Sequence, residues 1–86
     1  MSDLKITLTD DEYAEIVRRE RNYLGFGPQV AEMSDLEVLR KGVARTRRIM
    51  RQTMKNGSAF VANQALIQFS DTQLAFNRAR MADSGE

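Results

Sequence analysis

A run of cations without acids is the part of this sequence best suited to bind a ligand. Residues 38–60 contain seven Lys and Arg residues and no acid, whereas residues 1–37 contain nine acids and four bases. Wound as a helix, at about 100° per residue, the run places its cations on one side. These cations are Arg40, Lys41, Arg45, Arg47, Arg48, Arg51 and Lys55. Because neighbouring like charges repel one another, the pattern predicts a surface that binds negative charge.

Two sources of negative charge fit this surface. A nucleic-acid backbone is one, because Arg pairs with phosphate oxygens and binding releases condensed counterions. The other is the protein itself, since Asp11, Glu15 and Glu20 could neutralise the cations within one chain or across a dimer. We favour double-stranded DNA as the partner. The residues expected to contact phosphate are Arg40, Lys41, Arg45, Arg48, Arg51 and Lys55.

The residue types that are missing argue against catalysis. The chain contains no Cys and no His, so it lacks thiolate metal ligands, disulfides and the usual general base near neutral pH. Acids cluster at Asp10, Asp11, Glu12 and Glu15, but acids are expected in the first turn of a helix. We therefore expect no enzyme activity, no cofactor and no metal site.

Length and hydropathy bear on location and assembly. No apolar run approaches the roughly 20 residues that span a bilayer, and the segment MSDLKITLTDDE has no secretory leader pattern. These features predict a cytoplasmic protein without membrane contact. A chain of 86 residues has a small core, and pairing with a second copy commonly completes such a core. We expect a homodimer.

Capping signals predict two helices that would position the cations. Thr9 followed by Glu12 forms a capping box, and the helix that it opens should run from Asp10 to Leu24 before Gly25 and Pro28 stop it. Tyr13, Ile16, Val17, Tyr23 and Leu24 form its apolar side. Ser34 and Glu37 form a second box, which opens the basic helix. Its apolar side consists of Leu36, Val38, Leu39, Val43, Ile49, Met50 and Met54, and Asn56 and Gly57 should end it in a left-handed cap.

The remaining segments suggest strands. Residues 4–9, LKITLT, alternate apolar and polar side chains as a half-buried strand does, and residues 61–69 repeat apolar groups with a period of two. A short helix should follow from Leu74 to Met81. The predicted fold class is thus α+β and mostly helical. One domain would combine a strand-helix-helix core at 1–57 with a C-terminal strand and helix extension at 58–86.

The order of these elements resembles a known family. LKITLTDDEYAEI and SDLEVLRKGV, within about residues 3–50, resemble the ribbon-helix-helix repressors of the Arc and MetJ type. The resemblance implies a dimer whose paired strands enter the DNA major groove, with Lys5 and Thr7 contacting bases. It also implies that Ser34 and Asp35, at the start of the second helix, hold a phosphate. The implied function is a sequence-specific transcriptional repressor or autoregulator.

A second function remains open. Some ribbon-helix-helix proteins are antitoxins whose C-terminal extension captures a protein, and residues 58–82 are apolar enough for such a partner. The apolar residues concerned are Phe60, Leu66, Ile67, Phe69, Leu74 and Phe76, most of which we expect in the core. The chain could then be a small inhibitor or adaptor of the mobile-element kind. Its basic helix would engage an acidic protein surface or block the nucleic-acid site of an enzyme.

Overall fold

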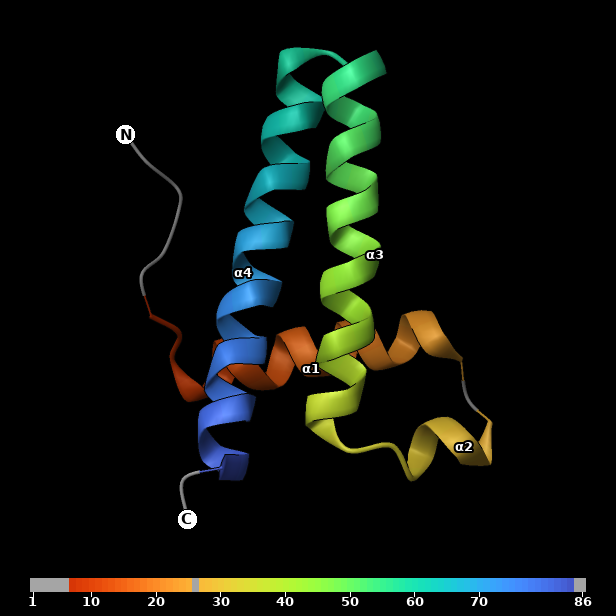
Figure 1. Cartoon of the computed structure of the whole chain (residues 1–86), viewed down its shortest axis with the longest axis vertical. Coiled ribbons are helices and arrows are strands. Elements are labelled where there is room, and N and C mark those ends of the chain that lie inside the picture. The colour runs from red at the N-terminus through yellow and green to blue at the C-terminus, as the bar shows by residue number, and fades with distance from the viewer. Residues whose placement is uncertain (1–6, 26, 85–86) are drawn as a thin grey trace.

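The protein is a helical hairpin crossed by a third helix. The computed structural model describes residues 7–25 and 27–84, which form α1 (Asp10–Leu24), α2 (Pro28–Ala31), α3 (Asp35–Asn56) and α4 (Ala59–Ser84). Helices α3 and α4 run side by side in opposite directions, and α1 crosses them steeply near one end of the hairpin (Figure 1). The short α2 leads from α1 to the start of α3. The hairpin and α1 thus form a single packed body.

The predicted bounds of α1 are confirmed, because local signals determine both ends. The Thr9 hydroxyl accepts a hydrogen bond from the Glu12 amide at 3.1 Å, and the Glu12 carboxylate accepts one from the Thr9 amide at 2.9 Å. These two bonds satisfy amides that have no partner within the helix. At the other end, Gly25 adopts a φ of 107°, a backbone conformation that glycine adopts most readily.

The predicted bounds of α3 are also confirmed, although its last residue is not held as expected. Ser34 accepts a hydrogen bond from the Glu37 amide at 3.2 Å and so caps the first turn. Gly57 has a φ of −93°, so the predicted left-handed cap is wrong. A Cβ at this position would lie 2.8 Å from the Thr53 carbonyl oxygen. Glycine is therefore favoured over other residues at position 57 because the Thr53 backbone lies close, and not because of the φ angle.

The predicted α+β class is wrong, because the described residues form four helices and no strand. Of the expected N-terminal strand, Thr7–Thr9 is irregular and residues 4–6 lie outside the described residues. The described residues therefore do not form a ribbon-helix-helix fold. The C-terminal strand and the separate helix at Leu74–Met81 are likewise replaced by one continuous α4. Residues 59–84 pack along α3 as part of the hairpin.

The composition of the buried face of α4 explains the wrong strand prediction. The buried side chains of this helix are Ala65, Thr72, Ala75 and Ala79, which recur at helical spacing. All four are small, so they give little hydrophobic signal. The larger Leu66, Ile67 and Leu74 lie off this face and are only half-buried. The apparent period of two came from Val61, Ala65, Ile67 and Phe69, of which only Ala65 is on the buried face.

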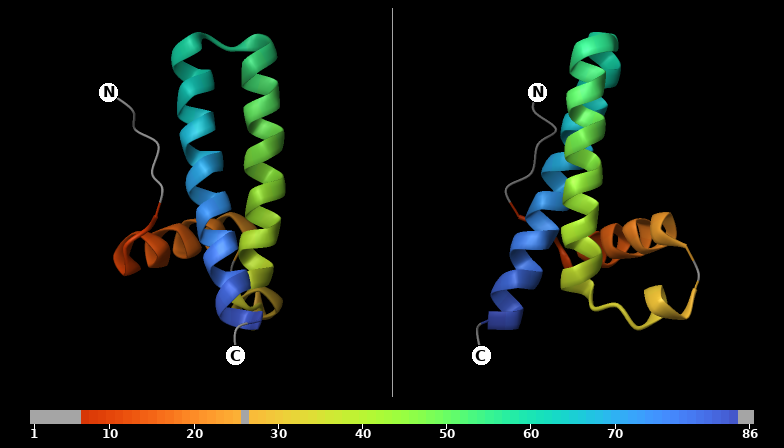
Figure 2. Two further views of the ribbon diagram at one scale, coloured as in Figure 1. Left: turned by 60° about the vertical axis from the view of Figure 1, so that its left-hand side comes forward. Right: turned by 45° about the vertical axis from the view of Figure 1, so that its right-hand side comes forward.

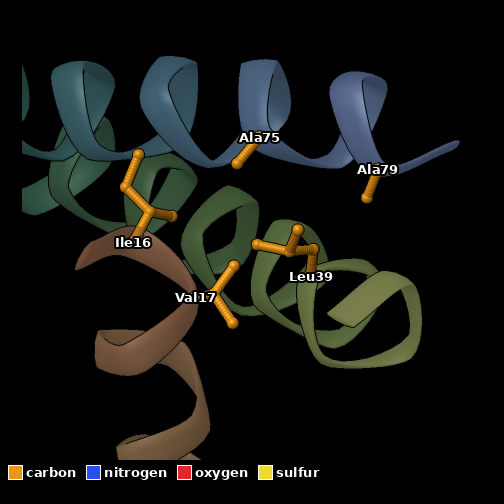
Figure 3. Packing of buried hydrophobic residues seen from close by; sticks show 5 residues of the cluster. All are labelled: Ile16, Val17, Leu39, Ala75 and Ala79. Carbon is orange, nitrogen blue, oxygen red and sulfur yellow. The ribbon is translucent and has the colours of Figure 1, made fainter. Parts of the chain in front are cut away.

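The core lies where α1 crosses the hairpin. Ile16 and Val17 of α1, Leu39 of α3, and Ala75 and Ala79 of α4 form one buried cluster (Figure 3). Leu39 is fully buried and lies between the other two helices in this view. The two alanines let the backbone of α4 approach closely, and Leu39 fills the remaining space. Most of the apolar contact that holds α1 is therefore concentrated on a few side chains.

The opposite end of the hairpin extends beyond α1 and is covered on fewer sides (Figure 2). Met54 and Phe60, near the turn between α3 and α4, are 66% and 72% exposed. Met54 is thus exposed although the sequence placed it on the apolar side of the helix, because α1 does not reach this end of the hairpin. Among the helices of the described residues, none is both long and apolar enough to span a membrane.

Candidate nucleic-acid interface

Six exposed cations lie on the solvent side of α3, opposite its buried residues, and those at the two edges of this side approach α1 and α4. They are Arg40, Lys41, Arg47, Arg48, Arg51 and Lys55, which we call the α3 basic face. The buried residues of the helix, including Val38, Leu39 and Val43, occupy its other side. The division into a basic and an apolar side, predicted from helical spacing, is thus present in the structure.

Three of the cations in the basic run contact groups of the protein itself. Arg45 forms an ion pair with Glu20 of α1 at 2.8 Å and is not part of the exposed face. Arg40 forms an ion pair with Glu37 one turn before it on α3, where both side chains meet solvent. Arg47 lies 5.7 Å from the centroid of the Phe69 ring. Internal neutralisation by α1, the alternative that the sequence left open, therefore applies to Arg45.

The other cations have no carboxylate to neutralise them. Within residues 7–25 and 27–84, Lys41, Arg48, Arg51 and Lys55 form no ion pair. The side chains of Arg47, Arg48, Arg51, Lys55 and Met54 border a shallow hollow on α3. Since a single helix cannot enclose a cavity, this hollow is a surface between long side chains. It offers several guanidinium and ammonium groups to one extended anion.

Glu20 holds the three main helices together from a buried position. Its carboxylate is 2% exposed and accepts three hydrogen bonds from Arg45, at 2.8, 2.9 and 3.2 Å. It accepts a fourth from Arg19 Nε at 2.9 Å. Arg19 also donates to the Thr72 hydroxyl on α4 at 2.8 Å. Thr72 in turn donates to the Gln68 carbonyl at 2.7 Å, so each polar group has a partner.

Gly42 leaves room for this carboxylate. A Cβ on Gly42 would lie 2.8 Å from Glu20 Oε1 and 2.9 Å from Glu20 Cγ. Two arginines hold the Glu20 side chain, so it cannot easily move aside. A glycine inside α3 is thus explained by the close approach of α1.

Gly42→Ala should lower the free energy of unfolding by about 1 to 2 kcal/mol, because overpacking outweighs the better helix propensity of alanine. Urea unfolding monitored by circular dichroism measures the change. The control is the same substitution in a Glu20→Ala background, where the clash is absent and alanine should stabilise by about 1 kcal/mol. Stabilisation by Gly42→Ala in the native background would contradict the predicted clash.

Of the four residues singled out through the family resemblance, the structure describes Thr7, Ser34 and Asp35, and these lie elsewhere. Thr7 is exposed and outside any regular element, and Lys5 lies outside the described residues. The Ser34 hydroxyl caps α3, and Asp35 forms an ion pair with Arg21 at 2.9 Å. Their predicted roles in binding bases and phosphate depended on the ribbon-helix-helix fold, which the described residues do not form. None of these three lies on the α3 basic face.

Tyr23 was not recognised in the sequence as a site residue, and Glu20 was named only among the acids that could neutralise the cations. Tyr23 was placed on the apolar side of the first helix, but it is 61% exposed because α1 ends beyond its contact with α3. For Glu20 a signal existed, since it follows Ile16 and Val17 at helical spacing on the apolar side of α1. An acid in such a position indicates a buried ion pair.

The described chain is therefore an all-helical domain with a one-sided basic face and a buried ion-pair cluster behind that face. No protein-family model, curated protein or solved structure significantly matches the chain. In the part of the chain that the structure describes, no group of three or more acidic residues could hold a metal ion.

Proposed function

We propose that this protein binds double-stranded DNA through the α3 basic face, by contacts to the phosphate backbone. The observation that carries the proposal is the set of four exposed cations that form no ion pair with the described residues, Lys41, Arg48, Arg51 and Lys55. Held on one rigid helix, they repel one another, and a polyanion relieves this repulsion. Binding at a promoter would exclude other proteins, which is the repressor role suggested by the sequence.

The dimensions of the face support a helix lying along a DNA groove. From Arg40 to Lys55 the helix rises about 22 Å, at about 1.5 Å per residue. Lys41, Arg48 and Lys55 fall in one row along the helix, and Arg40, Arg47 and Arg51 in a second. The exposed Ala44 lies between the rows. A helix with its side chains is about 10 to 12 Å wide and the major groove about 12 Å, so each row would face one phosphate wall.

Salt dependence tests the proposal. If about five of these cations contact phosphate, the logarithm of the affinity for a duplex of about 20 base pairs should fall against the logarithm of salt with a slope of about −4.5. Fluorescence anisotropy between about 50 and about 200 mM salt measures this slope. Arg51→Ala should reduce its magnitude by about 0.9, and Arg48→Ala with Arg51→Ala by about 1.8.

The control for this experiment removes a cation from another surface. Arg80 lies near the end of α4 and is exposed, so Arg80→Ala should leave the slope unchanged. Thermal unfolding of each variant checks that the fold is intact. If wild-type protein fails to bind the duplex at about 50 mM salt, or if Arg51→Ala and Arg80→Ala have equal effects, the proposal is wrong.

A second candidate function is binding of an acidic protein surface, as expected of a small inhibitor or adaptor. The observation that favours it is the exposure of Met54, Phe60 and Val61 close to the cations at the end of α3. Exposed apolar side chains beside charge are typical of protein interfaces, where a hydrophobic centre is surrounded by a polar rim. If the protein does not bind DNA at low salt, this candidate is favoured over the first.

A further inference from the structure

Tyr23 is an exposed aromatic residue held in a fixed orientation beside the α3 basic face. The guanidinium of Arg45 lies 3.7 Å from the centroid of its ring. Arg45 therefore covers one face of the ring by a cation-π contact. Tyr23 is nevertheless 61% exposed, so a large part of the side chain meets solvent. The ring itself is large, flat and apolar.

The contact with Arg45 is rigid because a buried group holds it. Both oxygens of Glu20 accept hydrogen bonds from Arg45, and the Glu20 side chain is 2% exposed. The carboxylate, the guanidinium and the ring thus form three successive layers from the core to the surface. An aromatic ring ordered in advance loses little conformational entropy when a ligand stacks on it.

Two unpaired cations lie next to the ring. A hollow of about 230 Å³ lies between α1 and α3 at the surface. Tyr23, Lys41 and Arg48 are among its lining residues. Neither cation forms an ion pair within the described residues. A second, more open hollow on α1 is lined by Tyr23, Arg18 and Asn22, among others. The Tyr23 ring is therefore surrounded by polar side chains, among them two cations that could bind an anion.

We propose that Tyr23 stacks an unpaired nucleobase whose neighbouring phosphates are bound by Lys41 and Arg48. This proposal rests on the proposed function and specifies its ligand as DNA with an unpaired nucleotide, such as a single-stranded overhang next to a duplex. Every nucleobase has a flat π-face, so stacking on an aromatic ring requires no particular sequence. The remaining cations of the α3 basic face, Arg40, Arg47, Arg51 and Lys55, then bind the adjoining duplex.

Tyrosine fluorescence tests the stacking directly. The chain contains two Tyr and no Trp, so Tyr13→Phe leaves Tyr23 as the only strong fluorophore. Titrating this variant with oligo(dT) at about 50 mM salt should quench its emission, because the ring stacks on a base. If anisotropy shows that the oligonucleotide is bound but the tyrosine emission does not change, the proposal is wrong.

Affinity provides the second measurement. Wild-type protein should bind a duplex with a short dT overhang more tightly than the blunt duplex, by on the order of tenfold. Tyr23→Phe should keep this preference, since phenylalanine has the same flat ring. Tyr23→Leu should remove the preference and leave affinity for the blunt duplex unchanged. Urea unfolding of both variants checks that their folds are equally stable.

The outcomes separate this proposal from the proposed function. If wild-type protein binds blunt and overhang DNA equally well, the stacking proposal is wrong and backbone binding is retained. If wild-type protein binds overhang DNA but not the blunt duplex, the stacking proposal is supported and the proposed binding of duplex DNA is wrong. No binding to either DNA would overturn both.

Discussion

Glu20→Ala should lower the free energy of unfolding by about 3 kcal/mol. Removing one partner of a buried ion pair typically costs about 3 to 5 kcal/mol, because the charge left behind has neither water nor a counter-ion. Arg45 retains some access to solvent, with 20% of its side chain exposed, so we expect the lower end of this range. Urea unfolding monitored by circular dichroism provides the measurement.

The matched control for Glu20→Ala is Glu15→Ala. Glu15 is an exposed acid on the same helix, and its loss should change the unfolding free energy by less than about 0.5 kcal/mol. Replacing both Glu20 and Arg45 with methionine should recover part of the lost stability, since only Arg19, whose side chain is 30% exposed, then lacks its carboxylate partner. Equal effects of the two alanine substitutions would mean that the Glu20 cluster does not stabilise the packing of α1.

Leu39→Ala should also lower the free energy of unfolding by about 3 kcal/mol. Leu39 is fully buried between α1 and α4, and loss of a buried leucine side chain typically costs about 2 to 5 kcal/mol. The small Ala75 and Ala79 facing it cannot extend into the space that the substitution leaves. A cavity would therefore persist at the centre of the helix crossing, and the midpoint of urea unfolding should fall accordingly.

Met54→Ala on the same helix is the control for Leu39→Ala. Its side chain is 66% exposed, so the substitution should change the unfolding free energy by less than about 0.5 kcal/mol. A loss of less than about 1 kcal/mol for Leu39→Ala would show that the crossing adjusts to fill the cavity. In that case the core at the crossing would be less tightly packed than the structure indicates.

Sequence signals predicted α1 and α3 well because both ends of each helix are encoded locally. Thr9, Glu12 and Ser34 supply hydrogen bonds within their own helix, and glycine follows each helix directly. The one-sided distribution of cations on α3 also follows from helical spacing alone. Such features do not depend on how the helices pack. They could therefore be predicted without knowledge of the fold.

The features that were missed depend on packing between helices. The buried face of α4 consists of Ala65, Thr72 and two further alanines, which bury well only against a close neighbour. The partner of Glu20 could not be chosen from the sequence, because Arg45 meets it only after α1 crosses α3. The same crossing places Tyr23 beyond the contact and leaves it exposed. Local patterns contain no information about where two helices cross.

The chain order of these helices has a consequence for protein synthesis. Helix α1 is made first, but its partners lie on α3 and α4, and Thr72 follows Arg19 by 53 residues. At about 5 to 20 residues per second, a ribosome needs about 3 to 10 seconds to make that stretch. During this interval Ile16 and Val17 lack their partners on α4, whereas Arg45 of α3 follows Glu20 by only 25 residues. The nascent α1 is thus the segment most available to chaperones until translation reaches α4.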